Sequence, residues 1–308
     1  MALSKNRVII SKVETTEGVD STPTAGADAC QVLELETGFD TDDYEREISV
    51  PWLGKNPVNY TRRQVSFQFS VELSGSGTAG TAPAWGKFVQ ACGFSENIAG
   101  GTVTYSPVSS GFPSLTMKSN HDGVQYVGLG CRGSFEIECK IGEVPIINFE
   151  FMGGYVSPAD VVLPVATYGL QAEPIHFASG NTTGTLDGYA FCIEEFSVDL
   201  NNDMTFRELV NCAKTNKITQ REVEGEILVE RPETLAIKNL YPKIEAGTLV
   251  PFTMTHGTTA GNKVKIEMPT LQLNFPEQDD SDGILMDNYE FGAIPVSPGN
   301  NEITITSF

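Results

Sequence analysis

The chain has 308 residues, 40% of them hydrophobic, so it can bury a substantial core without disulfides or bound metal. It carries 40 acidic and 20 basic residues, which gives a formal net charge of −20. A surface this negative repels phosphate backbones and disfavours tight or sequence-specific nucleic-acid binding, although acidity also serves solubility.

The cysteines and histidines form no pattern that indicates chemistry. Six cysteines lack CxxC spacing and a histidine at ligand spacing, which predicts buried small side chains in a reducing compartment. His121, His176 and His256 are isolated beside turn residues, so we expect surface or turn histidines rather than bases or ligands. Residues 279–283 resemble half of an EF-hand, but two required ligand positions hold glutamine and tyrosine. We predict no enzyme activity, no cofactor and no metal site.

The N-terminal region offers little to bury. Residues 1–12 contain one short apolar run, and no stretch approaches the ~20 apolar residues of a membrane-spanning helix. We therefore expect no membrane partner and folding in a cytoplasm. Residues 12–29 are small, polar and rich in turn formers, which predicts an extended arm over residues 1–29. Such an arm is either disordered alone or held against a neighbouring subunit.

One β-type segment occurs twice, over residues 46–73 and 207–230. In each copy a polar connection leads to an alternating strand, with apolar side chains on one face and polar side chains on the other. Duplication doubles contact surfaces without creating chemistry, so the repeat predicts a structural building block. In the connection of the first copy, Trp52 is a candidate for a subunit contact.

A short helix is predicted after each copy of the strand. Residues 84–93 place Trp85, Phe88 and Val89 at helical spacing, and Gly93 stops the pattern. Residues 233–241 predict a second helix that ends before a proline. A strand followed by a helix at matching positions supports the duplication.

A hairpin is predicted between the two copies. Residues 134–141 and 146–152 alternate strictly, with one face packed and the other rich in acids and facing water. A doubled glutamate at 194–195 shifts the phase of the next strand and predicts a bulge, and residues 276–283 are expected to form an acidic loop.

These patterns predict a mainly β fold with two similar sandwich-like domains, each with a short flanking helix. The expected organisation is an N-terminal arm over 1–29, a first domain over 30–160, a junction over 161–189 and a second domain over 190–308.

Three segments carry a family resemblance: residues 14–23, residues 199–230, and residues 263–269 leading through Asp282-Gly283 to residues 301–305. With them the chain resembles the tail tube (major tail) proteins of long, non-contractile-tailed bacteriophages over most of its length. The resemblance implies β-sandwich or half-barrel domains whose rings stack into a tube. The inner wall of that tube is a continuous β-barrel through which DNA passes on ejection.

The resemblance also implies partners and a location. Six-fold rings are common in the family, so a chain with two tube units is expected to form a ring of three, with six copies as the alternative. Other expected partners are the tape measure, tail terminator and distal tail proteins, within a virion tail assembled in the host bacterial cytoplasm. DNA would pass through the lumen without specific binding, because acidic walls do not release counterions from its backbone. The candidate lumen-facing residues are Glu136, Glu138, Lys140, Glu150, Glu222, Glu224 and Glu226.

Two other classes stay open on the sequence alone. One is another β-rich virion protein, such as a capsid decoration or fibre component. The other, a secreted carbohydrate-binding module, would require a signal peptide and exposed aromatic platforms, for which only Trp52 is a candidate.

Overall fold

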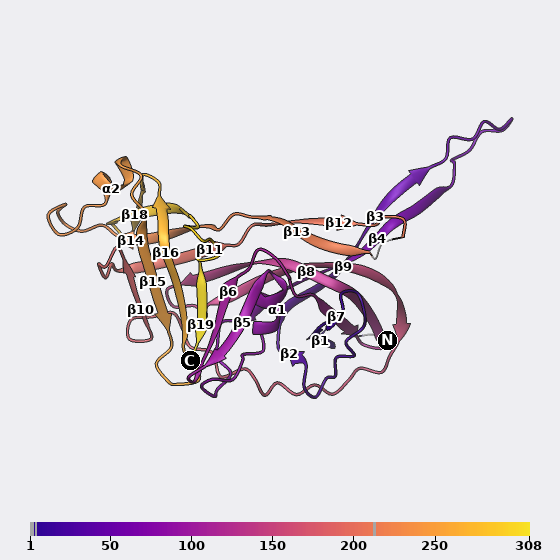
Figure 1. The fold of residues 1–308 in the computed structure, drawn as a ribbon, viewed down its shortest axis with the longest axis horizontal. Helices are drawn as coiled ribbons and strands as arrows, with labels where there is room; N and C mark the ends of the chain where they lie inside the picture. Colours follow the sequence, from indigo (N-terminus) through magenta and orange to yellow (C-terminus); the bar gives the residue numbers. More distant parts are fainter. Residues whose placement is uncertain (1–2, 4, 212–213) are drawn as a thin grey trace.

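The computed structural model describes residues 3, 5–211 and 214–308, and their fold is mainly β, as predicted (Figure 1). The first half contains β1 (Arg7–Val13), β2 (Ala29–Cys30), β3 (Leu33–Glu45), β4 (Val58–Glu72), α1 (Gly86–Ala91), β5 (Phe94–Ala99), β6 (Thr102–Pro107), β7 (Leu115–His121), β8 (Val124–Lys140) and β9 (Ile146–Asp160). The second half contains β10 (Thr182–Leu186), β11 (Ile193–Asp199), β12 (Asn202–Arg207), β13 (Thr215–Arg221), β14 (Glu224–Glu230), α2 (Tyr241–Glu245), β15 (Val250–His256), β16 (Val264–Leu273), β17 (Glu277–Ser281), β18 (Ile284–Ala293) and β19 (Thr304–Ser307).

The two halves share one antiparallel strand order. It runs β1-β7-β8-β9-β4-β3 in the first half. In the second half it runs β10-β15-β16-β18-β14-β11. Helix α1 follows β4, and α2 follows β14. Where β8 is one long strand, the second half has β16 and then β17, separated at Pro276. This equivalence supports the duplication seen in the sequence. The domain limits over 30–160, 161–189 and 190–308 stay a prediction.

The halves are joined edge to edge. Residues Glu136–Lys140 at the end of β8 pair with β9 on one side and with β11 on the other. We call this β8–β11 contact the internal joint. It creates a main sheet of eight neighbouring antiparallel strands, β3-β4-β9-β8-β11-β14-β18-β17. Strand β19 makes a second connection, because it pairs with β6 of the first half and β16 of the second.

One hydrophobic cluster runs under both halves. In the first half the ring of Phe69 lies 4.9 Å from that of Phe88 and 5.6 Å from that of Phe149. In the second half Phe196 stacks on Phe252 with 4.8 Å between ring centroids. The alternation predicted for the strands explains this, since every second side chain of the main sheet enters the cluster and the others face water.

One of the two predicted helices is confirmed and the other is displaced. Helix α1 lies within residues 84–93, and the Trp85 indole next to it donates to the carbonyl oxygen of Ser74 at 2.7 Å. The prediction of a helix over 233–241 is wrong, since α2 begins at Tyr241 with Pro242 in its first turn. A proline fits there because the first amides of a helix have no partner within it.

Two further details concern the second half. The bulge predicted at the doubled glutamate is confirmed by a register shift between Ile193 and Glu195. The predicted acidic loop over 276–283 is wrong, because 277–281 forms β17 and pairs with β18. Its cross-strand hydrogen bonds hold a charged sequence in a strand, against its low intrinsic preference for one.

Each half sends out a hairpin arm. The tip of the β3–β4 hairpin, residues 41–61, projects from the body, whereas the β12–β13 hairpin, residues 202–221, runs across the first half (Figure 1). We call these the free arm and the docked arm. They are equivalent in position, because each connects the two strands that pair in its half.

Candidate functional site

The seven polar residues predicted to share a surface lie on one face of the main sheet. One hollow on this face is bordered by Glu136, Glu150, Glu222 and Glu224. An adjoining hollow is bordered by Glu136 as well, together with the three remaining candidates, which are Glu138, Lys140 and Glu226. The structure thus brings all seven together across both halves. Whether this face lines a lumen stays a prediction.

The acidic face is ordered by cross-strand contacts. Lys140 forms an ion pair with Glu195 across the internal joint. Asn148 of β9 donates to Glu138 of β8 at 2.9 Å, and Asn288 of β18 donates to Glu226 of β14 at 2.8 Å. In each case the two side chains lie diagonally across neighbouring strands on the same face, where an amide can hold a carboxylate in place.

Crowding changes the protonation of one of these acids. Burial, and then the charges of Glu138 and Asp199, raise the pKa of Glu136 above its usual value of 4.5. Beside the internal joint, the hydrogen bond and the negative charge of Glu195 raise the pKa of Lys140, which favours its cationic form. The residues that line the two hollows therefore carry many negative charges, with Lys140 as a cation among them.

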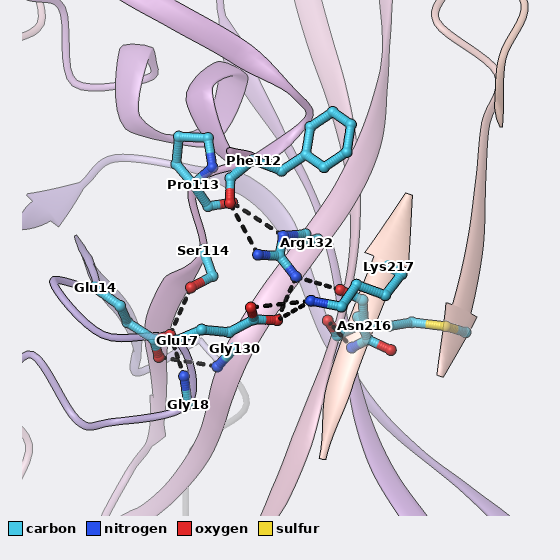
Figure 2. Close-up of polar contacts among 11 residues, drawn as sticks. Glu14, Glu17, Gly18, Phe112, Pro113, Ser114, Gly130, Arg132, Asn216 and Lys217 are labelled. Atoms are coloured by element: carbon cyan, nitrogen blue, oxygen red, sulfur yellow. Dashed lines mark hydrogen bonds and ion pairs between the residues drawn. The ribbon is translucent and has the colours of Figure 1, made fainter. Parts of the chain in front are cut away.

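A buried arginine fastens the docked arm to the first half (Figure 2). The guanidinium of Arg132, with only 4% of its side chain exposed, pairs with Glu17 at 2.5 Å. It also donates to the carbonyl oxygens of Phe112 at 2.8 Å and Pro113 at 3.2 Å, and to that of Asn216 in the docked arm. We call this cluster the Arg132 clamp.

Two further contacts complete the clamp. The Asn216 amide donates to the carbonyl oxygen of Met152 at 2.6 Å, and Lys217 pairs with Glu17 at 3.1 Å. Burial alone would raise the pKa of Glu17, but the hydrogen bonds and charges of Arg132 and Lys217 outweigh it and lower that pKa. The clamp is therefore a fully ionised network that bridges the two halves.

The N-terminal segment that supplies Glu17 to the clamp is anchored by Glu14. Glu14 is buried and accepts hydrogen bonds from the Gly18 and Gly130 amides and from the hydroxyls of Ser114 and Thr116, at 2.7 to 2.9 Å. The segment expected to be an arm over residues 1–29 thus contacts its own chain, and β1 within it pairs with β7.

Sequence reasoning missed Arg132 and Glu14. For Arg132 a signal exists, because a lone base stands within the apolar and glycine-rich run 127–133 of β8, where a buried charge needs partners. For Glu14 no signal exists, since three of the four groups that donate to it, on Ser114, Thr116 and Gly130, lie about a hundred positions further along the chain.

The predictions for the histidines and cysteines need two corrections, at His256 and at Cys192. His256 is buried rather than at the surface, and its ring contacts the hydroxyl of Thr182 at 2.8 Å and the carbonyl oxygen of Ile175 at 3.1 Å. Among the described cysteines Cys30, Cys92, Cys131 and Cys139 are buried as predicted, Cys192 is exposed, and Cys212 lies outside the described residues.

Two surveys of the described residues complete the picture. No group of three or more His, Cys, Asp or Glu is placed to hold a metal ion. No helix among them is long and apolar enough to cross a membrane.

Both outer edges of the main sheet are open. Among the described residues β3 pairs only with β4, and β17 only with β18. Open edges of this length are ready to pair with another chain, as are the exposed Tyr44, Trp52 and Tyr60 of the free arm.

Open sheet edges and a projecting arm leave main-chain groups and large side chains of this β protein available to pair with another chain. In agreement with this, residues 4–302 match the family described as phage tail tube protein. The chain therefore belongs to the phage tail tube protein family. The match favours a structural tail component over a capsid decoration or fibre protein. No curated protein matches the chain.

Proposed function

We propose that this chain forms the tail tube of a long, non-contractile-tailed phage, with three copies in each ring and the rings stacked into a hollow cylinder. The observation that carries the proposal is the internal joint. Strand β11 is equivalent to β3, and the end of β8 is equivalent to β17, so the chain contains within itself the contact that its two open edges lack.

The equivalence gives a register for the contact between copies. In the internal joint Ser197 lies opposite Glu138, and Val198 lies opposite Ile137. Transferred to the open edges, Glu36 of one copy lies opposite Asp279 of the next, and Thr37 opposite Gln278. Repetition of one head-to-tail contact closes a ring, and three chains of two units give pseudo-six-fold symmetry. Six chains in a ring are the alternative.

Closure of the ring requires that one hydrogen bond at the β3 edge be exchanged for hydrogen bonds to the neighbouring copy. The guanidinium of Arg7 donates to the carbonyl oxygen of Leu35, a residue that follows the bulge of β3. A neighbouring strand would replace this hydrogen bond with ladder bonds of the main sheet. The exchange costs little, because the carbonyl oxygen keeps a partner.

The acidic face is proposed as the wall of the lumen. A closed ring of main sheets has one inner face, and the hollows lined by Glu136, Glu150 and Glu226 support the acidic face for that role. DNA passing along it meets few cations, so its counterions stay with the backbone and transit is not slowed by adhesion. The tube would join tape measure, tail terminator and distal tail proteins in the virion, after assembly in the host bacterial cytoplasm.

Electron microscopy of the purified, concentrated protein tests the proposal. We expect stacked hollow rings, three copies per ring in a reconstruction, and the acidic face on the inner wall. Monomers at every concentration would refute self-assembly. Rings with the carboxylates on the outer wall would refute the lumen assignment alone.

A further inference from the structure

The docked arm shows how an arm of this fold binds a half of this fold. Its side chains alternate, with Phe206, Asn216 and Ile218 buried against the first half and Thr205 and Arg207 exposed. The buried face lies against Gly93, just after the C-cap of α1, because a Cβ added to Gly93 would lie 3.4 Å from the Cδ1 atom of Ile218.

Hydrogen bonds fix the root of the docked arm. The Asn202 amide donates to the carbonyl oxygens of Cys92 at 2.8 Å and of Gly133 at 2.9 Å. The seat of the arm is therefore the end of the helix together with the middle of β8, and Arg132 holds the arm's main chain beside it.

The second half carries an equivalent seat. Gly247 follows α2 as Gly93 follows α1, and both have positive φ, +60° and +95°. Gln272 lies opposite Gly292 of β18, as Arg132 lies opposite Met152 of β9. A Cβ added to Gly247 would lie 3.9 Å from Nε2 of Gln272, so the two residues adjoin.

This second seat is uncovered within the chain. Gln272 and Gly247 are exposed, and beside them Phe275 is 59% exposed. The free arm cannot reach it, since α2 and the free arm lie at opposite ends of the molecule (Figure 1).

The free arm presents the matching face. Matching the registers of the two hairpins places Tyr60 where the docked arm has Ile218, and Val58 where it has Asn216. Tyr60 is 63% exposed, an unusual position for a large ring with no partner. At the root, Arg62 donates to the carbonyl oxygen of Phe206 at 2.7 Å, so the docked arm sets the direction in which the free arm leaves the body.

We propose that the free arm of each copy lies over the second half of a neighbouring copy, with the Tyr60 ring against Gly247 and Phe275 and the main chain near Val58 held by the Gln272 amide. The partner is a second copy of this chain, selected by the same contacts that the docked arm makes within the chain. The inference rests on the proposed ring, and it adds a contact that the sheet edges alone do not require.

Photocrosslinking of the full-length protein tests the contact with a matched pair of positions. Tyr60 and Tyr44 have nearly equal exposure, 63% and 62%, but lie on opposite faces of the free arm, because Tyr60 pairs with Asp43 and Tyr44 with Asn59. Each is replaced in turn by p-benzoylphenylalanine, assembled tubes are irradiated, and crosslinked peptides are identified by mass spectrometry.

We expect the Tyr60 position to crosslink between chains to peptides containing Gly247 and residues 272–275. Its yield should be roughly ten-fold above that of the Tyr44 position, because insertion needs a C–H bond within contact distance, roughly 4 Å. Tubes whose Tyr60 crosslinks fall elsewhere, or match those of Tyr44, would overturn the inference and leave the proposed ring intact. If no assembly forms, the proposed ring and the proposed contact of the free arm are both refuted.

Discussion

The two hairpin arms occupy equivalent places, yet one is docked and the other is free. The docked arm buries Phe206, Asn216 and Ile218 on its own chain, whereas Tyr44 and Tyr60 of the free arm face water. The first half receives this contact from within the chain, and we propose that the second half receives it from another molecule. The docked arm is thus the template for the interface proposed between copies.

The sheet edges allow the same comparison, because the internal joint and the open edges of β3 and β17 differ in charge. The internal joint contains the Lys140–Glu195 ion pair. The open edges have no such cation: β3 carries Glu34 and Glu36, and β17 carries Glu277, Asp279 and Asp280. Closing the open edges brings like charges together, so the internal joint is the stronger of the two.

The largest expected effect comes from blocking the β17 edge. Gln278→Pro and Asp279→Pro form a matched pair, because main-chain groups of successive strand residues point to opposite edges. At one of these two positions proline removes an amide that bonds to β18. At the other it removes only an amide that points away from β18 at the open edge, and this is the outward variant. We expect the outward variant to keep the melting curve of the parent and to form no rings in electron micrographs. Tubes from both variants would contradict pairing at this edge.

Next in size is the loss of the Arg132 clamp. Arg132→Met removes the buried one of the two cations that pair with Glu17, which keeps Lys217, and it leaves several main-chain oxygens without their donor; breaking such a buried pair costs about 3–5 kcal/mol. Urea denaturation should show this loss. Arg207→Met, on the exposed face of the docked arm, is the control and should change the unfolding free energy by less than about 0.5 kcal/mol. Equal effects of the two substitutions would show that the clamp does not fasten the arm.

Local patterns explain why much of this fold could be predicted. Strict alternation over 65–73 and 134–152 identified strands of the main sheet, and the spacing of Trp85, Phe88 and Val89 identified α1. Alternation also placed the seven candidates on a polar face, since side-chain direction follows from the period alone.

What escaped prediction depends on strand pairing, helix-end geometry and long-range contacts, none of which alternation reports. The charged residues 277–281 form β17 only because β18 follows them directly, and α2 was displaced because Pro242 serves as a first-turn residue. The clamp joins Glu17, Arg132 and Asn216, which lie far apart along the chain. No periodicity reports such contacts.

A smaller effect is expected from neutralising the acids of the open edges. The double variant Glu36→Gln with Asp279→Asn should form rings at a two- to five-fold lower concentration at low salt, because opposed like charges cost about 0.2–1 kcal/mol. Above about 0.5 M salt the difference should vanish through screening. Sedimentation across a concentration series measures it, with Glu233→Gln as a remote control. An unchanged threshold would show that these residues do not meet.

The smallest expected effects concern the pH dependence of stability. They distinguish Glu136 from Glu17, whose pKa values are shifted in opposite directions. The pKa of Glu136 is raised, so the folded protein takes up this proton before the unfolded chain does. Its destabilising effect is present at neutral pH and disappears as the pH falls through the raised pKa towards 4.5. The pKa of Glu17 is lowered, so its contribution is complete above 4.5 and is lost as the pH falls further.

The two glutamine variants should therefore act in opposite directions at pH 7. Glu136→Gln should stabilise the protein by less than about 1 kcal/mol, since the group is partly exposed and screened, and should flatten the stability profile above pH 4.5. Glu17→Gln should destabilise it and flatten the profile below that pH. Urea denaturation at intervals of about one pH unit between pH 3 and 8 resolves the pH ranges above and below 4.5. If both variants changed stability with the same sign at pH 7, the acidic face and the clamp would not differ in the way their contacts indicate.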